Sequence, residues 1–282
     1  MSTARIAVLM PCFDEGDLLL ESVASVREQE PVEILVIDDA SSNSRTLELL
    51  ERLEGEGVTV LRQPSNAGPG AARTAGLHAT RAEYVFSLDA DDLVEPGMLA
   101  RMATLLDGRP EAGVAYGDHQ EFGDGEVLRR APERIDPFRL LYVFEYPPAA
   151  LFRRSVLERL GGWEAEGIRL PAYEDWHLWL KLAEHGVQGV HVGPGVITYR
   201  RRLHGDRLLT RARKQHRSLY RTLRRLHPAL FAQVGQHRRA SDLSTRRKLL
   251  YPIVYGGRPK FSFEHRIRVA LERHGLRISG GP

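Results

Sequence analysis

The stretch Tyr84-Val-Phe-Ser-Leu88-Asp89-Ala90-Asp91-Asp92 joins a short apolar run to a cluster of acids. The apolar run is typical of a strand that is covered on both faces of a sheet. Asp89 and Asp91 repel each other unless a cation or hydrogen-bond donors neutralise them. Because Mg²⁺ and Mn²⁺ prefer oxygen ligands and often join carboxylates to phosphates, this pattern indicates a site for a cation and a nucleotide diphosphate. For the stretch taken alone, a polar turn with helix-capping aspartates is the alternative.

Working outward, similar apolar runs alternate with segments of helical spacing. The predicted strands, besides 84–88, are Ile6–Met10, Ile34–Ile37 and Val58–Leu61. The predicted helices between them are Leu18–Val26, Thr46–Leu53 and Ala71–Thr80. Beyond residue 99, a helix through 106, a strand at 112–116, a loop-rich stretch through 148 and helices near 155 and over 173–185 are expected. This alternation predicts an α/β fold with an open, mostly parallel sheet flanked by helices.

Polar residues follow each of the first four predicted strands, at 11–15, 38–39, 65–70 and 89–92. In open α/β sheets ligands bind beyond the carboxyl ends of the strands, so these segments are expected at one rim. Asp39 can accept a hydrogen bond from a base or a ribose there, or cap the next helix. The glycine-rich loop from Asn66 leads into a helix carrying Arg73, an arrangement suited to phosphate oxygens or only to a turn.

Composition narrows the class of protein. The chain has 282 residues, of which 42% are hydrophobic, enough for one large domain or two small ones. Cys12 is its single cysteine, which excludes an intramolecular disulfide and indicates a reducing compartment. Acids return at Asp14 and Glu15, too early for a signal-peptide core, and no apolar run is long enough to span a bilayer. We therefore expect a cytoplasmic protein.

The formal net charge of +3 conceals a strong asymmetry along the chain. From Val196 to Pro282 there are 22 Lys and Arg against four acids, so the first 195 residues carry an excess of 15 acids. An acidic body thus precedes a basic tail. The tail is suited to an anionic surface, which composition alone leaves open as a phospholipid membrane, a nucleic acid or the body itself.

Four motifs in order resemble the family 2 glycosyltransferases of the GT-A fold. They are Val8-Leu-Met-Pro11-Cys-Phe13-Asp-Glu15, Val36-Ile-Asp38-Asp39-Ala-Ser, Asn66-Ala-Gly68 through Ala72-Arg73-Thr-Ala-Gly76, and Leu88-Asp89-Ala90-Asp91-Asp92. A fifth is Leu160-Gly-Gly-Trp163-Glu followed by Tyr173-Glu174-Asp175-Trp, similar to the acceptor-side segment and Glu-Asp motif of that family. The resemblance extends from residue 6 to about residue 204 and implies an inverting enzyme that moves one sugar from a nucleotide-diphospho-sugar to a hydroxyl acceptor.

The resemblance also implies roles for individual residues. Asp91 binds Mn²⁺ or Mg²⁺, and His204, in Tyr199-Arg-Arg-Arg-Leu-His204, completes the metal shell or contacts the diphosphate. Asp175 removes the proton of the acceptor hydroxyl. Trp163 and Glu174 belong to the acceptor side, although a core position is the other reading for Trp163. The donor, of UDP, GDP or dTDP type, is lined by the following residues: Pro11, Phe13, Glu15, Asp39, Asn66, Arg73, Asp89, Ala90 and Asp91.

The expected organisation is a catalytic domain over 1–205, divided into a nucleotide-binding half (1–100) and an acceptor-binding half (101–205), and a basic helical extension over 206–282. From residue 200 to 226, bases interleave with leucines, and Leu219, Leu223 and Leu226 share one helical face. Such a helix packs on the acidic body, which we favour, or lies on the inner face of an anionic membrane.

Other functions fit less well. A dinucleotide-dependent oxidoreductase needs a Gly-x-Gly-x-x-Gly turn after its first strand, where Pro11-Cys-Phe-Asp-Glu-Gly stands instead. Nucleic acid is not expected as a partner, because the basic tail carries only scattered aromatics and no known motif. The remaining alternative is a catalytically inactive module of the same fold. Processive relatives have membrane helices and a Gln-x-x-Arg-Trp motif, neither of which occurs here, so transfer of a single sugar is expected.

Overall fold

The computed structural model describes residues 4–27, 31–165, 168, 170, 172–204 and 215–255. Its strands are β1 (Ile6–Cys12), β2 (Glu33–Asp38), β3 (Thr59–Arg62), β4 (Tyr84–Ser87), β5 (Leu93–Val94), β6 (Ala112–Tyr116), β7 (Asp118–Gly123), β8 (Val127–Arg129), β9 (Leu151–Arg153), β10 (Gln188–His191) and β11 (Ile197–Leu203). Its helices are α1 (Leu18–Arg27), α2 (Ser44–Gly55), α3 (Pro69–Ala79), α4 (Met98–Asp107), α5 (Pro137–Leu140), α6 (Arg154–Leu160), α7 (Glu174–Glu184), α9 (His216–Leu226), α10 (Pro228–Ala232), α11 (Val234–Ala240) and α12 (Thr245–Tyr255).

In the described ranges the strands form two sheets. The larger has seven strands in the order β10-β6-β9-β4-β1-β2-β3, and the smaller has four in the order β5-β11-β7-β8. Strand β1 pairs in parallel with β2 and β4, and β2 pairs in parallel with β3. The antiparallel strand β9 lies between β4 and β6. The predicted α/β fold with a mostly parallel sheet is therefore confirmed.

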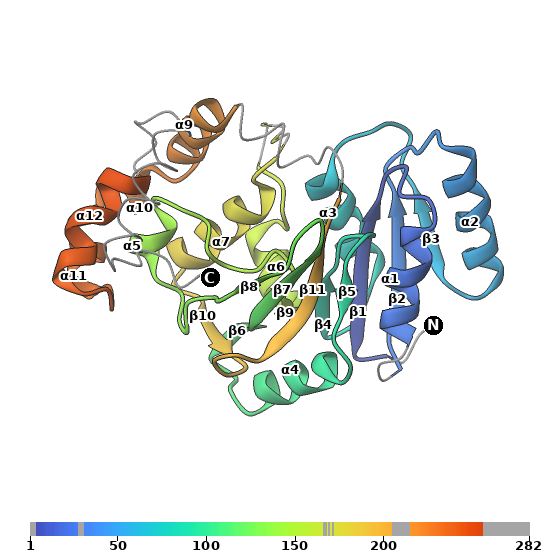
Figure 1. Cartoon of the computed structure of the whole chain (residues 1–282), viewed down its shortest axis with the longest axis horizontal. Coiled ribbons are helices and arrows are strands. Elements are labelled where there is room, and N and C mark those ends of the chain that lie inside the picture. Colours follow the sequence, from blue (N-terminus) through green and yellow to red (C-terminus); the bar gives the residue numbers. More distant parts are fainter. Residues whose placement is uncertain are drawn as a thin grey trace.

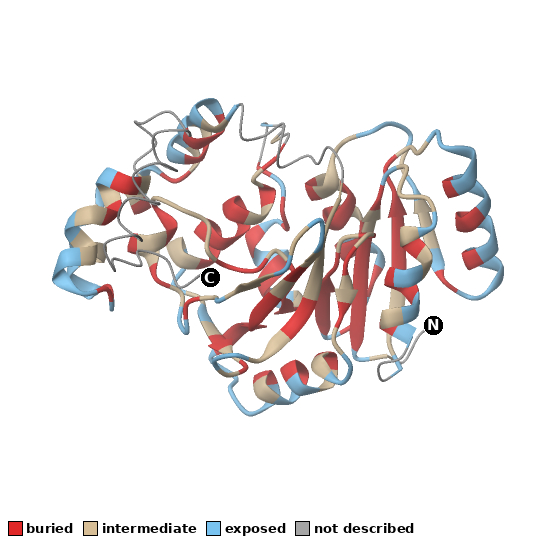
Figure 2. Cartoon of the chain, in the orientation of Figure 1, coloured by how far each residue is buried: buried red, intermediate tan, exposed pale blue. Residues whose placement is uncertain are grey.

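The large sheet is covered on both faces, which explains the uninterrupted apolar run of β1. Ile6, Val8 and Met10 join one buried cluster, which includes apolar residues of α1, α2 and α4. Ala7 and Leu9 point to the other face, into a cluster with residues of α3, α6 and α7. Figure 2 shows these strands buried along their length, while α2 exposes its outer side. Side chains of a strand alternate between faces, so each face receives half of the run.

One glycine lets α3 lie close against this sheet. A Cβ at Gly76 would come within 2.8 Å of Ile37 Cδ1 and 3.0 Å of Leu9 Cδ2. Any side chain there would push α3 away from β1 and β2, at a cost of the order of 1–3 kcal/mol for overpacking. The small residues of α3 thus hold its N-terminus at the carboxyl ends of the strands.

The sequence prediction was wrong in two places. The stretch over 117–148, predicted to be mainly loop, contains β7, β8 and α5, and the run from residue 200, predicted to start a basic helix, is strand β11. These strands carry charged side chains that are neutralised across the sheet. Glu121 on β7 forms ion pairs with Arg129 on β8 at 2.8 Å and Arg201 on β11 at 3.6 Å. A periodicity of apolar residues does not reveal strands that are paired through charges.

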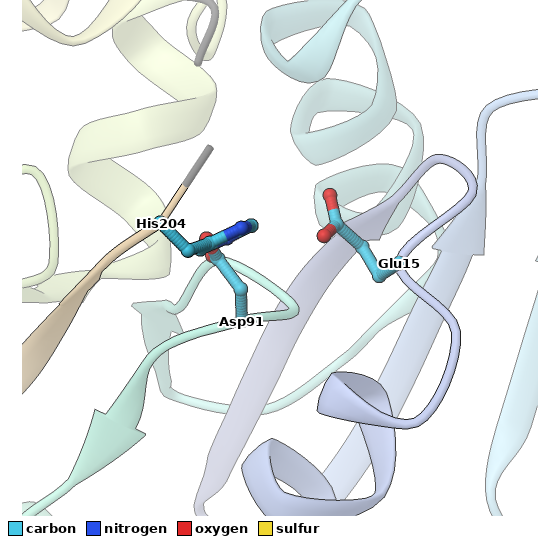
Figure 3. A group of neighbouring side chains, drawn as sticks. All are labelled: Glu15, Asp91 and His204. Atoms are coloured by element: carbon cyan, nitrogen blue, oxygen red, sulfur yellow. The ribbon is translucent and has the colours of Figure 1, made fainter. Parts of the chain in front are cut away.

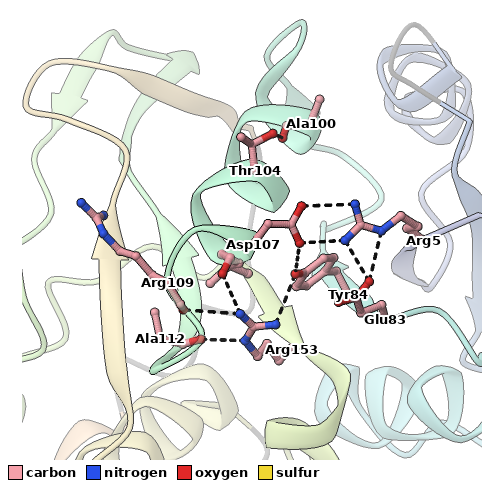
Figure 4. Close-up of polar contacts among 10 residues, drawn as sticks. Arg5, Glu83, Tyr84, Ala100, Thr104, Asp107, Arg109, Ala112 and Arg153 are labelled. Atoms are coloured by element: carbon pink, nitrogen blue, oxygen red, sulfur yellow. Dashed lines mark hydrogen bonds and ion pairs between the residues drawn. The ribbon is translucent and has the colours of Figure 1, made fainter.

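A network of polar contacts ties the elements together at the opposite end of the sheet from the acidic loops (Figure 4). Arg5 binds Glu83 at 2.9 Å and Asp107 at 2.7 Å, joining the start of β1 to the start of β4 and the end of α4. Arg153 donates to Tyr84 Oη at 3.2 Å and to the carbonyl of Ala112 at 2.9 Å. The N-terminal ends of the central strands are therefore fixed to one another.

The helices after residue 215 pack on the rest of the molecule. Figure 1 shows α9 to α12 at the end of the molecule away from α1 and α2. Tyr220, Leu223 and Leu230 belong to the same buried cluster as α7. Tyr251 of α12 packs on Phe138 of α5. Packing of the basic extension on the body, the favoured expectation, is confirmed for residues 215–255, while 205–214 and 256–282 lie outside the described residues.

Candidate active site

The polar segments that follow the first four strands lie at one edge of the large sheet, as predicted. Asp14 Oδ1, after β1, accepts hydrogen bonds from the backbone N–H groups of Ser42 and Asn43, after β2, at 2.7 Å each. Asp89, after β4, accepts a hydrogen bond from Arg73 of α3. Residues far apart in the sequence thus form a single polar region at the carboxyl ends of the strands.

Asp39 shapes the loop ahead of α3. Its Oδ1 accepts from the N–H of Ala67 at 2.7 Å and its Oδ2 from the N–H of Gly68 at 2.8 Å, and the residue is 4% exposed. Gly68 has a φ of 95°, which a residue with a side chain rarely adopts. Each carboxylate oxygen has a second lone pair, so Asp39 keeps the capacity to accept from a nucleoside as well. That contact stays a prediction.

The other predicted donor-site residues differ in exposure. Phe13 is 45% exposed, Pro11 is half-buried, and Asn66 is exposed in the loop ahead of α3. Ala90 is buried, and its carbonyl accepts a hydrogen bond from Ser22 Oγ of α1 at 2.9 Å. The exposed ring of Phe13 is available for stacking on a base. Ala90, by contrast, serves to hold the acidic loop against α1.

Asp91 lies beside a histidine from the end of β11, as the resemblance implied. His204 Nε2 and Asp91 Oδ2 are 2.9 Å apart. Glu15, from the loop after β1, completes a group whose ligand atoms all lie within 4.8 Å of one another. Figure 3 shows these three side chains coming from three separate segments and converging on one point. Glu15, predicted to line the nucleoside pocket, thus also lies next to the metal candidates.

The chemistry of this group fits a hard divalent cation. Carboxylates are the ligands that Mn²⁺ and Mg²⁺ prefer, with water and phosphate filling the remaining positions, and an imidazole suits the transition-metal ion Mn²⁺ better than Mg²⁺. Burial first, and then the neighbouring acids Asp91, Asp89 and Asp14, raise the pKa of Glu15 to about 8. Burial and Asp89 also raise the pKa of Asp91. Carboxyls that are costly to ionise together would be stabilised by a cation between them.

Asp92 has a different role from its neighbours. It is 2% exposed, and its Oδ1 accepts from the backbone N–H of Arg202 at 2.8 Å. The side chain of Arg202 donates to the carbonyl of Asp91 at 3.0 Å and binds Glu21 of α1 at 2.5 Å. Arg202 therefore fastens β11, and with it His204, to the acidic loop. Sequence analysis missed this function because Arg202 stands in a run of three arginines at the start of the basic tail.

Arg73 connects the acidic loop to α7. Its guanidinium is 2% exposed and contacts three carboxylates: Asp89, Glu174 at 3.1 Å and Asp175 at 3.4 Å. A planar guanidinium with five N–H donors can serve several carboxylates at once, which a lysine cannot. The predicted position of Arg73 at the rim is confirmed, although its direct partners in this structure are carboxylates.

Asp175 is a largely buried carboxylate beside Arg73. Its side chain is 16% exposed, and its buried Oδ1 accepts no hydrogen bond within the described residues but lies 3.4 Å from the guanidinium of Arg73. Burial raises the pKa of Asp175 to about 8, with Arg73 opposing the rise and Glu174 and Asp89 adding to it. A carboxylate whose pKa lies near neutral pH is suited to accept a proton.

The two residues expected on the acceptor side are engaged in the interior. Trp163 is fully buried and packs against Phe152 and beneath Arg73, whose guanidinium carbon lies 6.0 Å from the ring centre. A ring without exposed surface offers no face to a sugar, so the structure supports the core reading of Trp163. Glu174 is 8% exposed and directs Oε1 to Arg73. Both residues contact Arg73 in this structure, Trp163 through its ring and Glu174 through its carboxylate.

Comparison with known proteins identifies the family. The sequence profile described as "Glycosyl transferase family 2" matches residues 7–161, more than half of the chain. The chain belongs to glycosyl transferase family 2. Its match covers the four strand-end segments and ends at the first glycine of the Gly161-Gly162-Trp163 turn.

Relatives of this family 2 chain include proteins named for polysaccharide assembly. It is 32% identical over 104 residues to the succinoglycan biosynthesis protein ExoO of Rhizobium meliloti, covering 36% of the chain and 30% of that protein. It is 35% identical over 96 residues to the poly(ribitol-phosphate) beta-N-acetylglucosaminyltransferase TarP of Staphylococcus aureus, covering 32% of the chain and 29% of that protein. The aligned part thus spans about three tenths of each of these two relatives.

Two solved structures have a similar fold. That of S. aureus TarS residues 1–349 in complex with UDP-GlcNAc has a TM-score of 0.63 at 16% identity and covers 97% of this chain and 78% of that one. That of the mannosyltransferase PcManGT from Pyrobaculum calidifontis, in complex with GDP-Man and Mn²⁺, has a TM-score of 0.57 at 18% identity. It covers 97% of this chain and 83% of the other. The fold of the family 2 chain is thus that of GT-A glycosyltransferases.

We expect Arg73→Met to lower the free energy of unfolding at pH 7 by about 3–5 kcal/mol, because it leaves buried carboxylates without their cation. The loss should be smaller at pH 5 than at pH 8, since Asp175, whose pKa is raised to about 8, is protonated at pH 5 and then adds no negative charge to the group. Urea unfolding at the two pH values measures both effects. The exposed Arg45, paired with Asp17 and Glu48, is the matched control, and Arg45→Met should hardly change stability. If the two substitutions lowered the free energy of unfolding equally, the contacts of Arg73 with the three carboxylates would not be a special source of stability.

Proposed function

We propose that the protein is an inverting glycosyltransferase that moves one sugar from a nucleotide-diphospho-sugar to a hydroxyl acceptor. Membership of family 2 supports the reaction class. The observation that carries the rest is Asp175, a mostly buried carboxylate with a raised pKa that is linked through Arg73 to Asp89 of the acidic loop. The proposed base thus lies apart from the side chains that would hold the cation, so both could act in one displacement. Within residues 4–204 and 215–255, as far as the structure describes them, no specific feature favours nucleic-acid binding or an inactive module.

The donor would bind along the carboxyl ends of β1 to β4. Phe13 and Pro11 offer apolar surface to the base, and Asp39 offers a hydrogen-bond acceptor, as the resemblance implies. Asp91 and His204, with Glu15 beside them, would hold Mn²⁺ or Mg²⁺. Such a cation offsets the negative charge that gathers on a departing diphosphate. The donor is expected to be of UDP, GDP or dTDP type.

Asp175 would take the proton of the acceptor hydroxyl. Because its pKa is raised to about 8, it holds a proton more strongly than an ordinary aspartate and is a better base once ionised. Arg73 contacts Asp175 at 3.4 Å and favours its ionised form. The same guanidinium binds Asp89. A donor and a metal that bind beside Asp89 would therefore change the electrostatic environment of Asp175 through one intermediate side chain, Arg73.

The extension offers a surface for peripheral contact with an anionic membrane. Each helix in the described part of the chain is too short or too polar to cross a bilayer. On α12, Leu249 and Ile253 are four residues apart and 55% and 59% exposed, and bases such as Arg246 and Lys248 flank them. Apolar side chains surrounded by bases are suited to the headgroup region of anionic lipids. Such contact would bring the catalytic body to a lipid-linked acceptor.

Nucleotide binding should depend on a divalent cation through Asp91. In a panel of UDP-, GDP- and dTDP-sugars, we expect one donor class to raise the melting temperature, and to do so mainly with Mn²⁺ present. Asp91→Asn removes a charge from the metal group and should weaken metal-dependent nucleotide binding by at least roughly 10-fold, measured by calorimetry. Asp124→Asn, at an exposed position on the turn after β7, is the control. Full affinity of Asp91→Asn with Mn²⁺ would refute the assignment.

Asp175→Asn keeps the size of the side chain and removes its basicity. Turnover of the donor selected by the panel, followed by released nucleoside diphosphate, should fall by about 10²–10⁴-fold with nucleotide affinity nearly unchanged. In the wild type kcat/KM should rise with pH to a plateau above about pH 8, because only ionised Asp175 accepts a proton. The sugar product should have the inverted anomeric configuration by NMR. Retention would exclude a single displacement, and near-normal turnover of the variant would move the base elsewhere.

Vesicle sedimentation tests the membrane contact. With vesicles of phosphatidylglycerol and phosphatidylcholine the protein should sediment at low salt and be released as salt rises, since charges are screened over about 8 Å at physiological ionic strength. Replacing Leu249 and Ile253 by Ser should weaken sedimentation, whereas Leu47→Ser, at an exposed position of α2, should not. Failure to sediment at low salt would leave the extension with its packing role alone.

A further inference from the structure

One face of α9 lies on the segment that leads into α7. His216, Leu219 and Tyr220 stand at positions i, i+3 and i+4, which share a helical face. Leu219 packs with Ala172 in a small buried cluster, and Tyr220 donates from Oη to the carbonyl of Leu141 at 2.5 Å. The contact surface of α9 therefore begins just before the Glu-Asp pair of α7.

The same face continues just beyond that pair. The rings of His216 and Trp176 are stacked with centres 6.4 Å apart, and Tyr220 lies 5.8 Å from Trp176. Trp176 itself is 4% exposed and donates from Nε1 to the carbonyl of Leu140 at 2.8 Å. Thus α9 contacts residues on both sides of Glu174 and Asp175, without being part of the sheet that carries the other site residues.

Tyr173, the residue before the pair, has an unusual backbone. Its φ is 71° and its ψ is 19°, a left-handed conformation that residues with a side chain adopt only where their surroundings impose it. Its carbonyl accepts the N–H of His177 at 2.8 Å, a hydrogen bond of the first turn of α7. The direction in which α7 starts, and with it the position of Asp175, therefore depends on the conformation of Tyr173.

A side-chain contact from α9 holds Tyr173 in place. Tyr173 Oη and His216 Nδ1 are 3.0 Å apart, and the two rings lie edge to face with centres 5.9 Å apart. These residues are 43 positions apart in the chain. The strained residue ahead of Asp175 is thus tied to the C-terminal extension.

We propose that His216 is a positioning residue for catalysis: through its hydrogen bond to Tyr173 it fixes the start of α7 and so the direction of the Asp175 carboxylate. This inference rests on the proposed function of Asp175 as the base. It gives the extension a part in the reaction that is separate from any membrane contact. A displacement of about 1 Å at a reacting group can cost about 100-fold in rate, so a single hydrogen bond at this point has a measurable effect.

Two substitutions of His216 separate the hydrogen bond from packing. His216→Asn keeps a polar atom close to the place of Nδ1, while His216→Leu fills similar space without one. In His216→Leu, kcat for release of nucleoside diphosphate should fall about 10- to 100-fold, with KM for the donor within about twofold of wild type. His216→Asn should retain most of kcat. His237→Phe, on α11, is the control in the same extension and should leave kcat unchanged.

Tyr173→Phe tests the other partner while keeping the ring contacts. It should lower kcat as much as His216→Leu does, and the double variant should lose no more than either single variant, because both remove one hydrogen bond. This variant also keeps the inference testable if His216→Leu fails to fold. Additive losses, or equal losses in His216→Asn and His216→Leu, would overturn the inference.

Amide hydrogen exchange over residues 172–178 gives a readout that needs no reaction. Exchange should become faster in His216→Leu and Tyr173→Phe and stay near wild type in His216→Asn and His237→Phe. Unchanged exchange in the first two variants would overturn the inference, whatever happens to Asp175. Faster exchange with unchanged turnover would overturn the role in catalysis and also count against Asp175 as the base, which Asp175→Asn then decides independently.

Discussion

The contacts of Arg73 with Asp89, Glu174 and Asp175 are the interaction on which the rest of the site depends. A buried guanidinium costs desolvation energy, and the three carboxylates around it would repel one another if it were absent. The arrangement needs α3 to lie very close to α7. A Cβ at Gly70 would be 3.0 Å from Cβ of Glu174, so this position tolerates no larger residue without movement. The guanidinium of Arg73 therefore joins α3, the acidic loop after β4 and the start of α7 at one point.

The acidic residues of the site have different surroundings, although three of them, Asp89, Asp91 and Asp92, are close together in the sequence. Asp91 lies beside His204 and Glu15 and also beside Asp89 and Asp92, and is suited to a metal, while Oδ1 of Asp92 accepts a hydrogen bond from the backbone of Arg202. Asp175 is buried against Arg73, with its Oδ1 3.4 Å from the guanidinium. Different partners thus give similar side chains different environments, as the proposed combination of cation binding and proton transfer at one site requires.

Rigidity comes from both ends of the molecule. The contacts of Arg5 and Arg153 fix the N-terminal ends of the central strands, so the loops at the carboxyl ends extend from a firm base. On the far side, α9 stacks on Trp176 and holds Tyr173, completing the support of α7. The extension, predicted as a separate basic tail, is in its described part a component of the same packed body.

The sequence by itself determined the parallel half of the sheet and the place of its loops, because buried strands have local apolar runs and parallel strands end at one rim. Ordered motifs around Asp39, Arg73, Asp91 and Asp175 also identified the family. Only the tertiary structure decided that β11 is a strand, that Asp92 binds the backbone of that strand and that Trp163 is core. These outcomes depend on partners distant in the chain, such as β7 for β11, Arg202 for Asp92 and Arg73 for Trp163. Local patterns record what a segment prefers, whereas the role of a charged or aromatic side chain is decided by the distant groups that fold against it.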